Sequence, residues 1–178
     1  MSFLDLVQQR RSCRRYSDKP VPSDCLARCV EAARLAPSAC NSQPWRFIIA
    51  RQDPLRRELG QRAFSGIYKM NEFARSAPVL VAVVRESSAY AALLGAAFRG
   101  TSYSLIDLGI ACEHFVLQAQ EEGLGTCWIG WFDAKAVKKI LRIPFYKRVE
   151  ILISLGYPPE PLAMKKNRKE SRQICEYR

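Results

Sequence analysis

The sequence predicts one layered domain of the α+β or α/β type. Apolar runs of strand length alternate along the chain with amphipathic stretches of helix length, which is the pattern of a sheet covered by helices. The chain has 178 residues, a length that favours one compact domain, and no internal repeat or Gly/Ser-rich linker divides it. With 48% hydrophobic and 25% charged residues, its composition is that of a folded protein and argues against disorder.

Two helices are expected near the N-terminus. A helix over residues 2–10 leads into an arginine-dense stretch that ends at Pro20 and Pro22. Ser23 then follows as the cap of a second helix, because its hydroxyl can accept a hydrogen bond from an unpaired N–H of the first turn. The apolar face of this helix, which runs up to Pro37, comprises Leu26, Val30, Ala33 and Leu35.

The middle of the chain is expected to form a loop, two strands and a helix. Residues 37–45 (PSACNSQPW) include two prolines, two serines and an asparagine, which are turn formers. Residues 46–50 are typical of a short strand, residues 54–62 of a surface helix, and residues 78–84 of a buried strand. Residues 85–100 match no clear pattern.

A long helix is expected over about residues 102–122, and Gly123 fits its C-terminal cap because glycine reaches the left-handed conformation at little steric cost. Residues 126–129 and 150–155 are expected to be strands, with a short helix over residues 134–141 between them. One apolar stripe of the long helix comprises Leu105, Leu108, Cys112, Phe115 and Ala119.

The net charge of +11 and the sequence pI near 9.6 suggest an anionic partner. Nucleic acid, an acidic membrane surface and a phosphorylated ligand are the three classes to consider. Most of the excess lies at the two ends, with +3 in residues 1–20 and +4 in residues 161–178.

The seven cysteines are odd in number and follow no secretory signal, so a disulfide framework is not expected. Cys25 and Cys29 form one pair on a helix face, which cannot complete a four-ligand metal site, and packing is the better interpretation. The longest apolar run, Ala77 to Val84, is far shorter than the ~20 residues of a membrane helix. These features favour a soluble cytoplasmic protein without a membrane partner.

Common catalytic and nucleotide-binding motifs are absent. There is no G-x-x-x-x-G-K-[ST] motif, and the Gly123-Leu124-Gly125 segment leads into a strand, with Trp128 in place of the third glycine of the dinucleotide fingerprint. The single histidine, His114, lies within the long helix, where packing is more common than catalysis.

The arginines around Ser12 are the strongest local candidates for chemistry. Guanidinium groups grip phosphate through paired hydrogen bonds, and a serine hydroxyl can complete such a cradle. A solvated charge run and a basic arm for nucleic acid are the alternatives that the spacing leaves open. The arginines concerned are Arg10, Arg11, Arg14 and Arg15.

Five blocks of sequence together resemble the nitroreductase family of flavin enzymes. They occur in the family's order and span nearly the whole chain, so in combination they are far more specific than any one of them. The blocks are RRSCRRYSDKPV, EAARLAPSACNSQPWRFIIA, GLGTCWIGWFD, ISLGYPPEP and KKNRK.

The resemblance implies an α+β nitroreductase-like fold over residues 1–178, with a central mixed or antiparallel sheet flanked by helices. It also implies an intertwined homodimer with two FMN molecules at its interface, onto which the basic extension of residues 161–178 packs. NAD(P)H would be the electron donor in a ping-pong reaction through flavin N5, and a nitroaromatic or quinone a plausible small-molecule acceptor. The flavin carries the redox chemistry, so no catalytic residue is assigned.

The resemblance also implies a set of FMN-binding residues. Arg10 and Ser12 would serve the phosphate end, and Arg14 would lie near the N1/O2 edge of the isoalloxazine, where reduction places negative charge. The remaining phosphate candidates are Arg11, Lys166 and Arg168. The loop expected to reach the flavin from the other subunit comprises Pro37, Ser38, Ala39 and Asn41, with Gln43 in support. The segment whose backbone N–H groups would approach N5 and O4 comprises Trp128, Ile129 and Gly130.

Two segments depart from the family pattern. Residues 64–76 are short, with Lys69 and Asn71 as candidates for contact with the flavin pyrimidine, and residues 85–104 are where substrate identity is expected to lie. Trp45 and Trp131 are expected to pack in the core or the dimer interface. The alternatives are other redox chemistry on the same flavin fold (reductive dehalogenation, dehydrogenation or oxygen-dependent flavin chemistry) and a basic nucleic-acid-binding module. No helix-turn-helix, zinc-finger or RNP motif supports the last, so nucleic acid is not expected as a partner.

Overall fold

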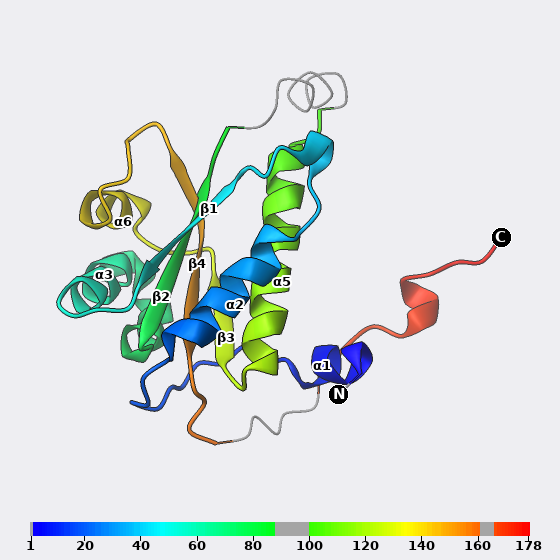
Figure 1. Ribbon diagram of the computed structural model, residues 1–178, viewed down its shortest axis with the longest axis horizontal. Coiled ribbons are helices and arrows are strands. Elements are labelled where there is room, and N and C mark those ends of the chain that lie inside the picture. Colours follow the sequence, from blue (N-terminus) through cyan, green and yellow to red (C-terminus); the bar gives the residue numbers. More distant parts are fainter. Residues whose placement is uncertain (1, 88–99, 161–165) are drawn as a thin grey trace.

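The computed structural model describes residues 2–87, 100–160 and 166–178. Its centre is an antiparallel four-stranded sheet in the order β1-β2-β4-β3 (Figure 1). The strands are β1 (Trp45–Ala50), β2 (Val79–Arg85), β3 (Gly125–Ile129) and β4 (Arg148–Gly156). The helices are α1 (Phe3–Gln9), α2 (Ser23–Arg34), α3 (Leu55–Ala63), α5 (Tyr103–Glu121) and α6 (Ala134–Ile140), and the 3-10 segments are η1 (Ala39–Asn41), η2 (Gly66–Ser76) and η3 (Ser171–Gln173).

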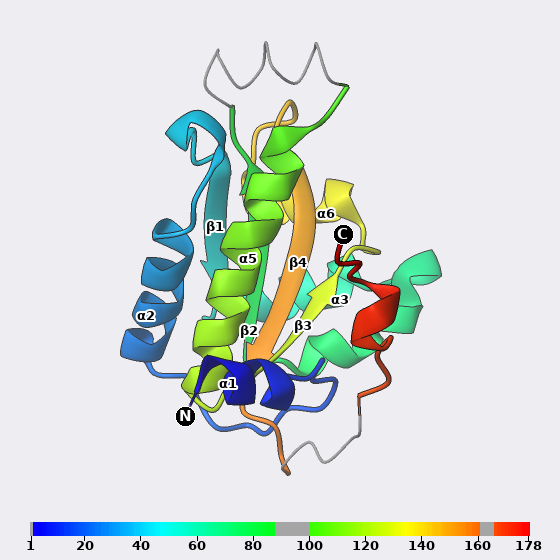
Figure 2. The same ribbon diagram turned by 90° about the vertical axis from the view of Figure 1, so that its right-hand side faces the viewer.

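Helices cover both faces of the sheet. In Figures 1 and 2, α2 and α5 lie on one face, whereas α3 and α6 lie on the other. Because side chains alternate along a strand, β2 serves both layers. Val79, Val81 and Val83 join the core with α2 and α5, whereas Leu80 and Ala82 join the core with α3 and α6. The apolar run of β2 follows from this double burial.

The predicted α+β class and the antiparallel form of the sheet are confirmed, and each predicted helix and strand lies within a few residues of an observed one. The capping role of Gly123 is also confirmed. Its φ is +73°, and Leu124 N–H donates to the Ala119 carbonyl at 2.8 Å while Gly123 N–H donates to the Gln120 carbonyl at 3.0 Å. This pair of bonds closes α5 in a Schellman motif.

Other local predictions were wrong. Pro22 is the N-cap of α2, and Ser23 is already helical, so its hydroxyl faces outward and accepts a hydrogen bond from Arg51 at 2.6 Å. Val30 and Leu35 are exposed because α2 turns a different face toward α5, and Leu105 is exposed in the first turn of α5. The buried face of α2 comprises Cys25, Leu26, Cys29 and Ala33.

Some features were missed or lie elsewhere. The 3-10 segment η2 occupies most of residues 64–76, for which no structure was predicted. The prediction that residues 85–104 define substrate identity falls largely outside the described residues, as does part of the extension 161–178. Across the described ranges, none of the helices is both long enough and apolar enough to span a membrane.

Candidate functional site

The segment that carries Ser12 lies along the open edge of β3. β3 is the last strand in the described sheet, so the backbone groups on its outer edge can pair with a neighbouring segment. Cys13 N–H donates to the Thr126 carbonyl at 2.8 Å, and Ser12 and Thr126 form a parallel bridge. Two residues further on, Arg14 lies close enough to Cys127 for its charge to act on that buried thiol, so the structure brings Arg14 near the predicted segment of residues 128–130.

A close contact allows this pairing. A Cβ on Gly125 would lie 2.6 Å from the Cβ of Cys13 and 2.7 Å from its Sγ, which is impossibly close. Only glycine at position 125 lets the two backbones approach in this way. Cys13 itself is fully buried.

A buried polar network holds the same segment from behind. The Tyr16 hydroxyl donates to the Cys13 carbonyl at 2.7 Å and accepts from the Ser154 hydroxyl at 2.7 Å. Burial raises the pKa of Tyr16, so the phenol stays protonated and keeps donating. Sequence reasoning missed Cys13, Tyr16 and Ser154 as supports of the site, because nothing in the local pattern links residues so far apart in the chain.

The basic residues from both ends of the chain gather beside this segment. The Lys166 ammonium donates to the Val7 carbonyl, and burial together with the charges of Arg11, Arg10 and Arg168 lowers the pKa of Lys166. Within the described ranges, the acid that faces this cluster is Glu113, whose carboxylate lies 3.7 Å from the Arg10 guanidinium. The remaining positive charge makes the cluster suited to an anion such as phosphate.

Gly130 directly follows β3 and borders open space, since an added Cβ would meet no atom within 4 Å. The next residue, Trp131, is half exposed but firmly held. Its indole N–H donates to the Ile67 carbonyl at 3.1 Å, and the Asn71 amide donates to the Trp131 carbonyl at 2.9 Å. Asn71, a predicted flavin contact, therefore binds the protein backbone, while Lys69 is exposed.

Both tryptophans that were expected to have packing roles, Trp45 and Trp131, make packing contacts. Trp45 packs against the core under α2 and α5, and Trp131 packs on η2, with its ring 5.2 Å from that of Tyr68. The Arg14 guanidinium lies 5.9 Å from the ring of Phe73, which places η2 at the side of the candidate site.

The loop of residues 37–43 lies elsewhere. It surrounds η1 at the end where α5 begins, whereas α1 crosses the end where α5 finishes (Figures 1 and 2). The loop is internally bonded: Gln43 N–H donates to the Ser38 hydroxyl at 3.0 Å, and the Gln43 amide donates to Asn41 Oδ1 at 3.0 Å. Within one chain, the structure thus does not bring Pro37, Ser38, Ala39 and Asn41 together with the arginines.

The family model described as "Nitroreductase family" matches residues 7–69 and 68–157. The chain belongs to the nitroreductase family. Among its relatives, the NADH dehydrogenase of Thermus thermophilus is 30% identical over 85% of this chain and 84% of its own length. The iodotyrosine deiodinase of Thermotoga neapolitana is 27% identical over 89% of this chain and 90% of its own length.

A solved nitroreductase-family structure supports the fold directly. The FMN-dependent nitroreductase from Clostridium difficile R20291 superposes with a TM-score of 0.71 at 26% identity, covering 96% of this chain and 94% of that one.

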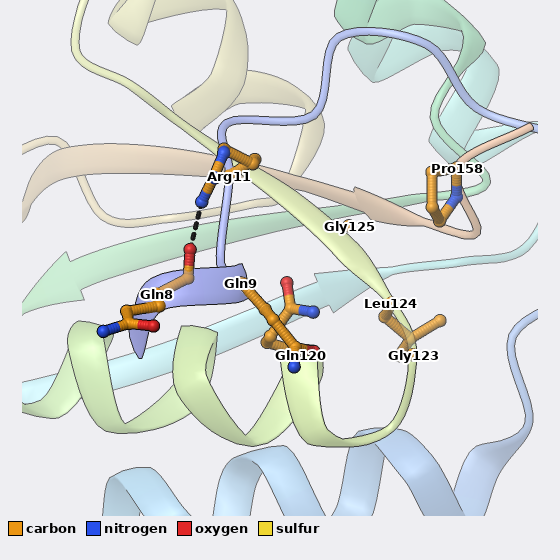
Figure 3. A pocket seen from close by; sticks show the side chains of 8 residues that line it. All are labelled: Gln8, Gln9, Arg11, Gln120, Gly123, Leu124, Gly125 and Pro158. Atoms are coloured by element: carbon orange, nitrogen blue, oxygen red, sulfur yellow. Dashed lines mark hydrogen bonds between the residues drawn. The ribbon is translucent and has the colours of Figure 1, made fainter. Parts of the chain in front are cut away.

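A cavity of about 470 Å³ lies next to the arginine segment, between α1, the end of α5 and the start of β3 (Figure 3). Arg11 contributes to it, and the Arg11 guanidinium donates to the Gln8 carbonyl at its rim. The other predicted nitroreductase site residues lie outside the cavity, so it adjoins the candidate site and does not coincide with it. Its remaining lining comprises Gln8, Gln9, Gln120, Gly123, Leu124, Gly125 and Pro158.

Proposed function

We propose that this protein is an FMN-dependent oxidoreductase that works as a homodimer. FMN, when bound, supplies two-electron redox chemistry between NAD(P)H and an acceptor such as a nitroaromatic or a quinone. The observation that carries the proposal is the meeting of the basic cluster, the Ser12 segment and the open end of β3 in one place. FMN has a phosphate, a polar ring edge and a flat ring system, and these three parts need a basic cluster, polar groups and open space, respectively.

The residues present fit FMN. Arg10 and Arg168 lie close enough to Lys166 for their charges to act on it, and these three residues would hold the phosphate together with Arg11 and the Ser12 hydroxyl. Burial and the neighbouring arginine charges lower the pKa of Lys166, and a bound dianion would relieve the repulsion among these cations.

Arg14 and the backbone at the end of β3 would serve the ring system. Arg14 lies close enough to Cys127 for its charge to act on that thiol, and in the proposed site it would lie near the backbone N–H groups of Ile129 and Gly130. A cation at the N1/O2 edge favours the negative charge that reduction places there. The open space at Gly130 leaves room for the ring.

A second chain would complete the site. The loop of residues 37–43 and the arginine segment lie at different ends of α5, so one chain cannot present both to the same ring. A homodimer in which each site combines the arginines of one chain with the loop of the other satisfies both positions. The exposed C-terminal segment, which extends outward on the α5 side in Figure 1, is available to pack on the partner.

The test is an absorption spectrum of protein reconstituted with FMN and freed of unbound flavin. We expect retained flavin bands that bleach on anaerobic addition of NADH or NADPH. Arg10→Ala is expected to weaken FMN binding about 10- to 100-fold, since hydrogen bonds to charged groups contribute roughly 1.5–3 kcal/mol. Arg62→Ala, at an exposed position on α3, is the matched control. Protein that retains no FMN would overturn the proposal.

Reductive deiodination is the second candidate, because one relative is named an iodotyrosine deiodinase. In that reaction an aryl carbon–iodine bond is replaced by a carbon–hydrogen bond, with two electrons and a proton consumed and iodide released. Bound flavin that is not bleached by NAD(P)H, together with iodide release from iodotyrosine under a chemical reductant, would favour this candidate over the first.

A further inference from the structure

Asp107 is a buried carboxylate with one oxygen bonded and the other unpaired. It lies in the second turn of α5 and is only 4% exposed. Its Oδ1 accepts a hydrogen bond from Ala39 N–H at 3.1 Å, and its Oδ2 has no hydrogen-bond partner within residues 2–87, 100–160 and 166–178. Burying a carboxylate in this way is costly, so a specific benefit is expected.

The loop that Asp107 holds is strained. Cys40, Asn41 and Gln43 have φ values of +51°, +50° and +44°, a region that residues other than glycine rarely adopt. The bonds between Ser38, Asn41 and Gln43 stabilise the loop internally, but they do not attach it to the rest of the fold. The bond from Ala39 to Asp107 joins η1 to α5 and so determines where the loop points.

We propose that Asp107 is a positioning residue for the FMN site of the partner subunit. By fixing η1 against α5, it holds residues 38–41 in place to reach the FMN that the second chain binds with Arg10 and Arg14. This inference rests on the proposed function. It assigns to Asp107 a role in that function, in which Asp107 acts on the site through residues 38–41 and does not touch FMN.

Three variants test the role of the carboxylate. Asp107→Leu removes the acceptor and keeps the number and branching of the side-chain heavy atoms; it is expected to raise the Kd for FMN, measured by flavin fluorescence quenching, about tenfold. Asp107→Asn keeps an acceptor oxygen and is expected to bind FMN within about threefold of the wild type. Glu121→Leu, at an exposed position on the same helix, is the matched control and is expected to change nothing.

A mixed dimer separates action on the partner from a local structural effect. A heterodimer of an Arg10→Ala chain and an Asp107→Leu chain, isolated with two different affinity tags, has one site with the intact Arg10 of one chain and the intact loop of the other. Such a dimer is expected to retain FMN in that one site, although each parent homodimer retains little. A purely structural or same-chain role predicts no recovery, because each site would then carry one defect.

Hydrogen exchange provides a readout that does not require FMN. The Ala39 amide is expected to be protected in the wild type and in Asp107→Asn, and to exchange rapidly in Asp107→Leu. Wild-type protein that binds no FMN overturns the proposed function and this inference together. Unchanged FMN affinity in Asp107→Leu, an unrecovered heterodimer, or equal exchange at Ala39 overturns this inference alone.

Discussion

Gly125 is the residue at which sequence, packing and site meet most closely. Its missing side chain lets Cys13 approach β3, and that approach places Ser12 on the strand edge, two residues before Arg14. Neither Gly125 nor Cys13 is assigned a role in binding or catalysis. Gly125 and Cys13 are both required because the backbone positions of the arginines depend on the contact between these two residues.

At this scale we predict that Gly125→Ala destabilises the protein by about 1–3 kcal/mol, since the added methyl group must displace buried Cys13. Urea denaturation measures the free energy of unfolding. Gly109→Ala is the control, because a Cβ there meets no atom within 4 Å. It is expected to leave stability unchanged or raise it by up to about 1 kcal/mol, as alanine favours a helix. Equal stabilities for Gly125→Ala and wild type would show that the segment can move aside.

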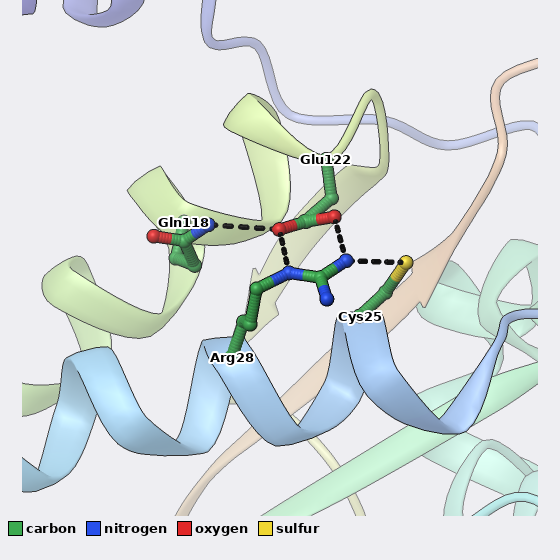
Figure 4. A network of polar contacts seen from close by, with 4 residues as sticks. All are labelled: Cys25, Arg28, Gln118 and Glu122. Atoms are coloured by element: carbon green, nitrogen blue, oxygen red, sulfur yellow. Dashed lines mark hydrogen bonds and ion pairs between the residues drawn. The ribbon is translucent and has the colours of Figure 1, made fainter.

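The pairing of α2 with α5 shows how two elements are joined at the surface. Glu122 is the C-terminal cap of α5. Both of its carboxylate oxygens accept hydrogen bonds from the Arg28 guanidinium at 2.6 Å, and the Gln118 amide donates to the same carboxylate at 2.9 Å (Figure 4). The hydrogen bonds from Arg28 lower the pKa of Glu122 from an ordinary 4.5 to about 2. The ionised carboxylate is thus favoured in the folded state.

A pH dependence follows from this shift. Because the pKa of Glu122 is lower in the folded than in the unfolded chain, its contribution is present above about pH 4.5 and is lost as the pH falls toward 2. We predict that Glu122→Gln loses less stability than the wild type between about pH 5 and pH 2, measured by urea denaturation across that range. Glu121→Gln, one residue away and exposed, serves as control and is expected to follow the wild type. Identical pH profiles for all three would contradict the prediction.

For the whole molecule, the separation of the arginine segment from the loop of residues 37–43 has a consequence for binding under the proposed function. If each FMN lies between two chains, FMN affinity must depend on the concentration of protein, because only the dimer holds a complete site. A site contained within one chain has no such dependence.

We therefore predict that FMN is released when the reconstituted protein is diluted below the concentration at which its dimer dissociates. Analytical ultracentrifugation detected at the flavin band would report both the size of the FMN-bound species and its dilution limit. FMN that sediments with a monomer, at an affinity independent of protein concentration, would contradict the shared site.

The sequence by itself determined the class of fold, the order of its elements and the family. Apolar periodicity marked β2 and α5 because burial on fixed faces leaves a local pattern, and Gly123 marked the end of α5 because its conformation is a local need. The arginines could be named as phosphate candidates because their chemistry belongs to the residue type, and the five motif blocks identified the nitroreductase family.

Only the tertiary structure decided how these residues are placed. Cys13 against Gly125, Tyr16 with Ser154, and Asp107 with Ala39 each join residues far apart in the chain. Such contacts leave no periodic or compositional signal, because they depend on how packed elements bring distant backbones together. For the same reason the sequence did not reveal that the arginines and the loop of residues 37–43 lie at different ends of α5.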